Sequence, residues 1–402
     1  MINFSELPLC EVLQVNLAKH QFVTPTPVQA QAIPPALDGR DVLATAQTGT
    51  GKTLAFLLPI LERLRRNPAK SIQAVVLVPT RELAMQVMET FTKLRPRTGV
   101  SGALVVGGLS EQPQLNEIRR GAQLVVATPG RLEDFIRRKL IRLNSVEVLV
   151  LDEADRMLDM GFQPAIQAIV AQLPASRQTM FFSATIEDSV AHLVNRYLED
   201  PAVVEIGSTK KPASSVRLQV FEVRHEHKIG LLEELITKEP GTFLVFTRTK
   251  HGTDKLAQKL SRSGHEAARI HGNRTQAQRT AALKGFQQGR YRILVATDVA
   301  ARGIHVENIG HVVNFDLPQV PEDFIHRVGR TGRAASTGTA STFVTPQERS
   351  DVRRIEQVLQ IKLERQPVSP EFAPPNIPEA APMSRGRNGR GRARRRFAYS
   401  AV

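Results

Sequence analysis

Residues 148–162 read VLVLDEADRMLDMGF, a run of branched apolar residues that ends in a cluster of carboxylates. An uninterrupted apolar run is typical of a strand buried on both faces of a parallel sheet. Asp152, Glu153 and Asp155 follow directly, and open parallel sheets bind their ligands beyond the carboxyl ends of the strands. Acidic residues in this position also cap helices, so the cluster alone leaves a purely structural role open.

Apolar runs of the same kind recur along the chain, each followed by a turn and a helical pattern. The first series occupies residues 41–46, 73–79, 103–106, 123–127, 146–151 and 179–183. The second series occupies residues 218–223, 242–247, 266–270, 292–296, 311–315 and 338–344. This alternation predicts an α/β fold with two tandem, doubly wound parallel-sheet domains.

Chain length and local composition set the expected boundaries. A chain of 402 residues exceeds the usual size of one core, and GSTKKPASS, at 207–215, has the small, polar and basic composition of a linker. We predict domains at 1–207 and 218–364, joined by a linker at 208–217. Residues 365–402 are proline-rich and then arginine- and glycine-rich, so we predict that they are disordered.

The net charge favours a polyanionic partner. The chain carries +15 at pH 7 with a pI near 10.4, and the tail contributes eight arginines against two glutamates. This tail either keeps the protein in solution or tethers RNA, and its excess of arginine favours the tether. A single cysteine, Cys10, and the lack of a leader or a membrane-length apolar run favour a cytoplasmic protein without membrane association.

A phosphate-binding loop follows the first strong strand. Residues 46–53 read AQTGTGKT, with Ala46 where the first glycine of such loops usually stands. Gly49 and Gly51 would let backbone N–H groups approach phosphates, Lys52 would contact the β and γ phosphates, and Thr53 would ligate Mg²⁺. The remaining loop residues expected around the phosphates are Gln47, Thr48 and Thr50.

The acidic strand end supplies the second half of a nucleoside triphosphatase. Asp152 would hold Mg²⁺ through its water shell, and Glu153 would orient and polarise the attacking water. Paired with the phosphate loop, the carboxylates are better explained by catalysis than by helix capping.

The motifs, read in order, resemble those of the DEAD-box RNA helicases over about residues 2–360. In the first half they are FVTPTPVQ (22–29), AQTGTGKT (46–53), PTRELA (79–84), GG (107–108), TPGR (128–131), DEAD (152–155) and SAT (183–185). In the second half they are FLVFTRTK (243–250), QAQR (276–279), ATDVAARG (296–303) and HRVGRTGR (326–333). The wording is most similar to that of the bacterial RhlE-like subgroup. The resemblance implies RecA-like domains, ATP and Mg²⁺ as cofactors, and RNA as the partner.

The resemblance also implies roles for individual residues around the nucleotide. Gln29, in the segment that begins at Phe22, would pair with the adenine edge, and Phe4 would stack on the base. Arg330 and Arg333 stand three residues apart at a turn of the second domain, which suits arginine fingers that complete the site only when the domains close; a solvated basic helix start is the alternative. The resemblance places Gly303 at the nucleotide as well.

The resemblance likewise implies which residues transmit the nucleotide state and which bind RNA. Ser183, Thr185, Asp155 and His326 would transmit the nucleotide state, although Ser183 and Thr185 could equally cap the next helix. The expected RNA contacts are Pro79, Thr80, Arg81, Gly107, Gly108, Thr128, Pro129, Gly130, Arg131, Thr247, Arg248, Gln276, Arg279, Thr297 and Asp298. These motifs lack exposed aromatics, which favours sequence-independent contacts to phosphates and 2′-hydroxyls of single strands or short duplexes.

Three positions depart from the family pattern. His305 replaces an aspartate that would lie near the ATP ribose and the domain interface, which puts nucleotide affinity or closure in question. Gln21 stands where a glycine is usual, and Ala46 is the third departure.

Our main hypothesis is an RNA-stimulated ATPase that separates short RNA duplexes or remodels RNA–protein complexes, as a monomer, acting on ribosomal precursor particles or with RNA-decay proteins. A non-hydrolysing RNA clamp or annealing protein stays open because of His305 and the basic tail. A DNA-directed motor is a second alternative, against which PTRELA and TPGR argue. We expect the two domains to lie apart without ligand, because the shared surface is mostly polar.

Overall fold

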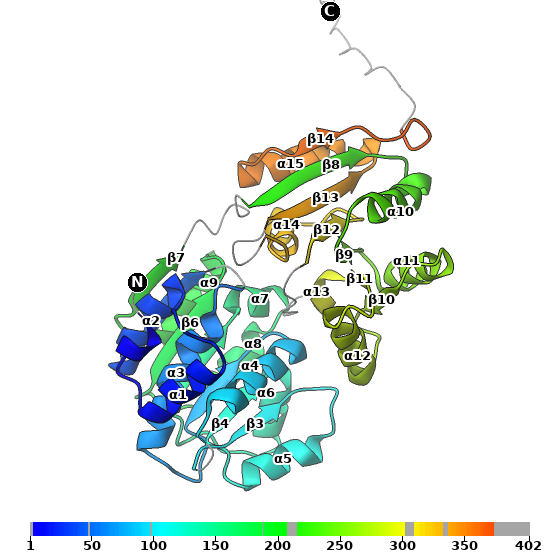
Figure 1. Cartoon of the computed structure of the whole chain (residues 1–402). Coiled ribbons are helices and arrows are strands. Elements are labelled where there is room, and N and C mark those ends of the chain that lie inside the picture. Colours follow the sequence, from blue (N-terminus) through cyan, green and yellow to red (C-terminus); the bar gives the residue numbers. More distant parts are fainter. Residues whose placement is uncertain are drawn as a thin grey trace, which may run out of the picture.

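The computed structural model describes residues 3–46, 49–96, 99–186, 188–206, 215–301, 309–332 and 337–373. Two α/β domains follow one another along the chain, each built on one parallel sheet with helices on both faces (Figure 1). The fold class predicted from the sequence is confirmed.

The first domain contains seven strands among its helices. The strands are β1 (Val42–Ala46), β2 (Ala74–Leu77), β3 (Gly102–Val105), β4 (Leu124–Ala127), β5 (Val148–Asp152), β6 (Gln178–Ser183) and β7 (Ala202–Ile206). The helices are η1 (Phe4–Glu6), α1 (Glu11–Lys19), α2 (Pro27–Leu37), α3 (Lys52–Arg66), α4 (Arg81–Leu94), α5 (Glu111–Arg119), α6 (Pro129–Arg137), α7 (Ala154–Asp159), α8 (Gln163–Val170) and α9 (Asp188–Tyr197).

The first sheet has the strand order β3-β4-β2-β5-β6-β1-β7, and its six neighbouring pairs are parallel. One apolar core lies on each face of the sheet. All six predicted strands are present, with ends within two residues of the prediction. The edge strand β7 was not predicted, because only Val204 in it is buried and its apolar signal is correspondingly short.

The second domain also has seven strands. They are β8 (Val216–Glu222), β9 (Phe243–Phe246), β10 (Ala267–Ile270), β11 (Ile293–Ala296), β12 (His311–Asn314), β13 (Gly338–Val344) and β14 (Glu364–Gln366). The helices are η2 (His225–His227), α10 (Lys228–Lys238), α11 (Lys250–Arg262), α12 (Gln276–Gln287), α13 (Asp298–Ala301), α14 (Pro321–Val328), η3 (Pro346–Glu348) and α15 (Arg349–Leu359). The strand order is β10-β11-β9-β12-β13-β8-β14, again parallel throughout.

Residues 364–373, which we call the strap, correct the predicted start of the disordered tail. β14 pairs with β8, and the carbonyls of Phe372 and Ala373 accept hydrogen bonds from the backbone N–H (3.3 Å) and side-chain Nε (3.0 Å) of Arg224. The ring of Phe372 packs on α10 beside Gly230. Proline-rich composition concealed this short strand and its single aromatic anchor. The rest of the predicted tail, 374–402, lies outside the described residues.

The linker prediction is corrected at its end, because β8 begins at Val216 and not after residue 217. Residues 207–214 lie outside the described residues. The chain leaves the first domain at Ile206, opposite Ala46 in the neighbouring strand. It enters the second at Ser215, whose Oγ donates to the carbonyl of Gly332 (2.9 Å).

The strand order arranges the motifs along one edge of each sheet. In the first domain the phosphate loop follows β1, the SAT motif follows β6 and the acidic motif follows β5. The motifs expected to face RNA follow β2, β4 and β3 on the far side of that edge. The nucleotide motifs and the RNA motifs therefore occupy opposite halves of one row, and the coupling motif after β6 lies between the phosphate loop and the acidic motif.

The two domains are in contact, so the expectation that they lie apart is wrong for this structure. Glu82, 3% exposed in α4, accepts hydrogen bonds from Gln276 Nε2 (2.8 Å) and pairs with Arg279 Nη2 (2.8 Å), both in α12 of the other domain. The shared surface is polar, as predicted. Its polar groups bind one another, however, which offsets the loss of their water contacts.

Candidate nucleotide and RNA sites

The phosphate loop is shaped by two glycines in left-handed conformations. Gly49 has φ +89° and Gly51 has φ +91°, where a side chain would be strained. A Cβ on Gly51 would also lie 2.3 Å from Gln29 Nε2. Lys52, 6% exposed at the start of α3, donates from Nζ to the carbonyl of Ala46 (3.0 Å). The loop is thus closed on itself by the lysine expected to contact phosphates.

Gln29 is tied to this loop from the opposite side. Its Nε2 donates to the carbonyl of Gly51 (2.9 Å), and its Oε1 accepts from the backbone N–H of Thr26 (2.8 Å). These bonds fix the amide at the start of α2 beside the loop. Sequence reasoning missed Thr26, although the T-x-x-Q pattern of a capping box signals it.

Two buried carboxylates lie where β5 ends. Asp152 Oδ1 accepts from the backbone N–H of Glu153 (3.0 Å), and both residues are 2% exposed. Glu153 has φ +51°, a conformation unusual for a residue other than glycine. Arg156 Nε lies 3.7 Å from Glu153 Oε2. Burial raises the pKa of Asp152 to about 6, against the opposing effect of the Lys52 charge.

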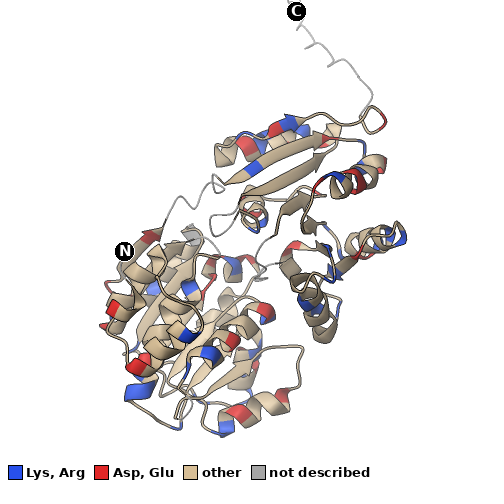
Figure 2. Cartoon of the chain, viewed as in Figure 1, with Lys and Arg blue, Asp and Glu red and all other residues tan. Residues whose placement is uncertain are grey.

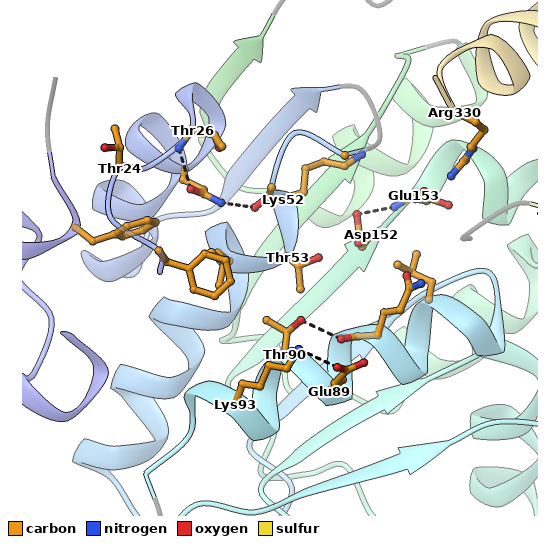
Figure 3. A pocket seen from close by; sticks show the side chains of 18 of the residues that line it. Thr24, Thr26, Lys52, Thr53, Glu89, Thr90, Lys93, Asp152, Glu153 and Arg330 are labelled. Carbon is orange, nitrogen blue, oxygen red and sulfur yellow. Dashed lines mark hydrogen bonds and ion pairs between the residues drawn. The ribbon is translucent and has the colours of Figure 1, made fainter. Parts of the chain in front are cut away.

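A cavity of about 490 Å³ brings the nucleotide residues together. Figure 3 shows Lys52, Thr53, Asp152 and Glu153 around it, with Arg330 reaching in from the second domain. The predicted residues that line it are Phe4, Phe22, Gln29, Gly49, Gly51, Lys52, Thr53, Asp152, Glu153 and Arg330. The volume falls in the range of small-molecule sites. Thr53 hydroxyl and Asp152 carboxylate oxygens at one cavity are the hard donors that Mg²⁺ prefers.

The same cavity has walls that sequence reasoning did not find. One wall is α4, and another residue comes from α12 of the second domain. These lining residues are Thr24, Thr26, Leu54, Leu83, Gln86, Glu89, Thr90, Lys93 and Gln287. The three- and four-residue spacing in α4 places its members on one helix face, but nothing in their type marks them as ligand contacts.

Not all predicted nucleotide residues line the cavity. Ala46 is buried in β1 and contributes only its carbonyl, and Thr50 is described but does not line it. Gln47, Thr48, Gly303, His305 and Arg333 lie outside the described residues.

The coupling motif reaches the acidic motif through backbone groups. Asp155 Oδ2 accepts from the backbone N–H groups of Ala184 (3.0 Å) and Thr185 (3.3 Å). The Ser183 hydroxyl instead donates to the carbonyl of Thr185 (2.7 Å). The two motifs are therefore joined through the peptide groups of Ala184 and Thr185.

A small gap of about 10 Å³ lies between the two domains next to this region. It is lined by Arg156 of the first domain and by Asp298, His326, Arg327 and Arg330 among those of the second. Arg327 holds Asp298 through two bonds of 2.6 and 2.7 Å. Asp298, predicted to contact RNA, is thus engaged by an arginine, while His326, predicted to transmit the nucleotide state, lines this gap between the domains.

A second cavity, of about 560 Å³, lies between the domains at the RNA motifs. The predicted residues that line it are Pro79, Thr80, Arg81, Gly107, Thr128, Gly130, Arg131 and Arg279. Burial, and next the neighbouring charge of Arg279, lower the pKa of Arg81. Three arginines and two acids, Glu82 and Asp134, line the cavity, and Glu82 pairs with Arg279. The remaining excess of guanidinium groups suits phosphates.

Other predicted RNA residues do not line this cavity. A Cβ on Gly108 would lie 1.9 Å from Arg81 Nη1, and Gln276 binds Glu82. The Thr247 hydroxyl bonds that of Thr253 (2.7 Å). Pro129 and Thr297 are described but do not line the cavity either.

A buried lysine organises the loop that contains Arg248. Lys228, 1% exposed, donates to the carbonyl of Phe315 (3.0 Å) and lies 3.9 Å from Asp316 and 3.6 Å from Glu348. Asp316 in turn accepts from the backbone N–H of Arg248 (2.9 Å), and Glu348 lies 3.7 Å from its guanidinium. This arrangement was not predicted from the sequence.

Two parallel-sheet domains that close over one phosphate-loop cavity, with an arginine supplied from the second domain, define the class of nucleotide-driven helicases. The family pattern described as DEAD/DEAH box helicase matches residues 26–193, and that of the helicase conserved C-terminal domain matches residues 227–335. A DEAD-box ATP-dependent RNA helicase CshA from Geobacillus kaustophilus (strain HTA426) is 41% identical over 94% of this chain and 80% of its own length.

This chain belongs to the DEAD-box ATP-dependent RNA helicases, and is an ATPase and helicase of that family. Saccharomyces cerevisiae Dbp5 bound to RNA and ADP BeF₃ is similar, with a TM-score of 0.83, 32% identity, and coverage of 90% of this chain and 95% of that chain. A DEAD box protein from Methanococcus jannaschii has a TM-score of 0.54 at 34% identity, covering 91% and 99%. The RhlE-like assignment stays a prediction.

Within the described part of the chain, no helix has both the length and the apolar character needed to cross a membrane.

Proposed function

We propose that this chain hydrolyses ATP with Mg²⁺ in the 490 Å³ cavity and uses closure of its domains to separate short RNA duplexes or to remodel RNA–protein complexes. The observation that carries the proposal is the entry of Arg330, from the second domain, into a cavity lined mostly by residues of the first domain. A site completed from both domains makes hydrolysis depend on closure.

The residues of the cavity suit separate steps of phosphoryl transfer. Lys52 would exchange the Ala46 carbonyl for phosphate oxygens. Thr53 and Asp152 would hold Mg²⁺, which supplies charge neutralisation at the phosphates when bound. Glu153 would orient and polarise the attacking water, and Arg330 would stabilise the charge that develops on the transferred phosphoryl group.

RNA would bind in the 560 Å³ cavity, where Arg81, Arg131 and Arg279 converge from both domains. Contacts from guanidinium and backbone groups would hold phosphates without reading bases. Because the Glu82 contacts to Gln276 and Arg279 border this cavity, RNA binding and domain closure would favour each other. The basic segment 374–402 would tether further RNA to the second domain.

We further propose that the protein acts in the cytoplasm as a monomer, on ribosomal precursor particles or together with RNA-decay proteins. His305 would tune nucleotide affinity and not abolish it, since a neutral imidazole can hydrogen-bond the ribose.

The test is steady-state ATP hydrolysis with and without single-stranded RNA, run in parallel on this protein and on His305→Asp. Strong stimulation of the unmodified protein by RNA is the expected result. Stimulation only after the aspartate is restored would indicate an RNA clamp in place of a helicase. Equal stimulation by a DNA strand would contradict recognition of 2′-hydroxyls and favour a DNA-directed motor.

A further inference from the structure

Helix α11 carries an exposed basic stripe that the proposed sites do not include. His251, Lys255, Lys259 and Arg262 recur at intervals of four, four and three residues and are all exposed. Such spacing places them on one face of a helix. The opposite face, with Leu256 among its buried residues, packs against β10 and β11. Figure 2 shows basic segments along α11 at the outer side of the second domain.

The stripe lacks compensating acids. Asp254, the only acidic residue of α11, is engaged elsewhere, since its Oδ1 lies 3.0 Å from Arg269 Nε and 3.1 Å from His271 Nε2. Among the residues that the structure describes, Lys255, Lys259 and Arg262 have neither an ion pair nor a side-chain hydrogen bond. Like charges four residues apart on a helix destabilise it by about 0.2–0.5 kcal/mol per pair, so a polyanion laid along the stripe would relieve this repulsion.

The first residue of α11, Lys250, lies beside the RNA cavity and directly before the stripe. Lys250 donates from Nζ to Asn273 Oδ1 (2.9 Å). A Cβ on the neighbouring Gly272 would lie 3.4 Å from Lys250 Cε, and Gly272 itself lines the 560 Å³ cavity. Only Gly272 and Asn273, which both contact Lys250, therefore separate that cavity from the start of α11.

We propose that α11 is an extension of the RNA site, along which the sugar-phosphate backbone runs after it leaves the interdomain cavity at Gly272. The stripe runs over the twelve residues from His251 to Arg262, or about 16 Å of helix at 1.5 Å per residue. A strand with a rise of about 3.4 Å per phosphate presents about five phosphates over that length. Flexible, unpaired cations contact phosphates without selecting bases, so the extension is independent of sequence.

This inference rests on the proposed RNA binding between the domains. It predicts a dependence on RNA length that the interdomain cavity alone does not produce. An RNA of about six nucleotides occupies the cavity only, whereas one of about thirty also covers α11.

The test is a triple variant, Lys255→Gln with Lys259→Gln and Arg262→Gln, in the full-length protein. The measurement is the RNA concentration that half-saturates ATP hydrolysis, for the short and the long RNA, over a range of salt. With the long RNA we expect an increase of about tenfold, because three exposed ion pairs are lost. The salt dependence should also fall by about two units of log–log slope, at about 0.7 per single-strand phosphate. The turnover number at saturating RNA, and all values with the short RNA, should stay unchanged.

A matched control removes the same charge elsewhere. The control variant is Arg119→Gln with Arg120→Gln and Lys139→Gln. Arg119 and Arg120 lie at the end of α5 and Lys139 follows α6, and none of the three lines either cavity. The control should leave the long RNA unaffected. Equal effects of the two triple variants, or equal effects on short and long RNA, would overturn the α11 extension. If neither RNA stimulated the unmodified protein, the proposed function itself would fail, which is a distinct result.

Discussion

Replacing Glu82 should shift the two domains from their closed arrangement toward an open one. In the described part of the chain, the Glu82 carboxylate bonds both Gln276 and Arg279 across the domain boundary, at 2.8 Å each. Truncating one partner of a buried, hydrogen-bonded ion pair costs about 2–5 kcal/mol. The Arg279 side chain is 11% exposed and returns to water when the domains part, so the lower end applies. A loss of about 2–3 kcal/mol lowers the closure constant about 30- to 150-fold.

Energy transfer between dyes on the two domains measures this equilibrium. Cys10 is the only cysteine, so Cys10→Ser provides a background for one engineered cysteine per domain. The variants are Glu82→Ala, Arg279→Ala and the double variant, compared with Glu11→Ala, which removes an exposed carboxylate from α1. The closed fraction is read at increasing concentrations of RNA and a non-hydrolysable ATP analogue.

The double-mutant cycle decides the interpretation. We expect the single variants to be strongly non-additive, with a coupling energy of about 2 kcal/mol between Glu82 and Arg279. A closed fraction equal to that of Glu11→Ala, or fully additive effects, would refute the view that this contact holds the domains together.

Three further results are expected. Glu153→Gln should keep ATP and RNA binding but lose turnover, because only the carboxylate that polarises water is changed; undiminished hydrolysis would contradict this role. Truncation after Ala373 should weaken RNA binding without changing thermal unfolding. Truncation after Leu363 should destabilise the second domain by about 2–4 kcal/mol, because it removes β14 and the Phe372 contact. His311, 2% exposed, has its pKa lowered to about 4 by burial, so the second domain should lose about 3 kcal/mol between pH 6.5 and pH 4.

The sign of the His311 effect follows from linkage. The unfolded chain binds a proton below about pH 6.5 and the folded domain only near pH 4, so the stability present above pH 6.5 is lost as the pH falls. Urea unfolding at several pH values measures it, with His311→Gln as the control that removes this titration. An equally steep loss in the variant would assign the effect to other groups.

Equal stability of the proteins truncated after Ala373 and after Leu363 would mean that the strap adds nothing to the stability of the second domain.

The sequence was sufficient for the buried parts of the fold. Continuous apolar strands such as Val148–Asp152 carry a strong signal because both faces of the sheet are covered. The edge strands β7 and β14 were missed, since an edge strand buries few side chains. Gln21, noted as a departure from glycine, has φ +61° after α1; this explains the usual glycine, because side chains are disfavoured in that conformation.

The nucleotide site was largely predictable because its chemistry is concentrated in contiguous motifs. The contacts that join motifs were less accessible. Ser183 was expected to transmit the nucleotide state, but its hydroxyl binds the Thr185 carbonyl, and Asp155 binds the peptide groups of Ala184 and Thr185. Lys228 gave no sequence signal, because a buried lysine and a surface lysine look alike until the carboxylates around it are placed.

The position of β7 has a mechanical consequence. The chain departs from the first domain at Ile206, beside the strand that ends in the phosphate loop, and joins the second at Ser215, bonded to the segment that follows Arg330. A rotation of one domain about Ile206 would move each group in proportion to its distance from β7. The phosphate loop lies about one strand spacing of ~4.8 Å from β7, while the predicted RNA motif after β4 lies about five spacings away. An angular change that shifted the phosphate loop by a fraction of an ångström would therefore shift that motif about five times as far.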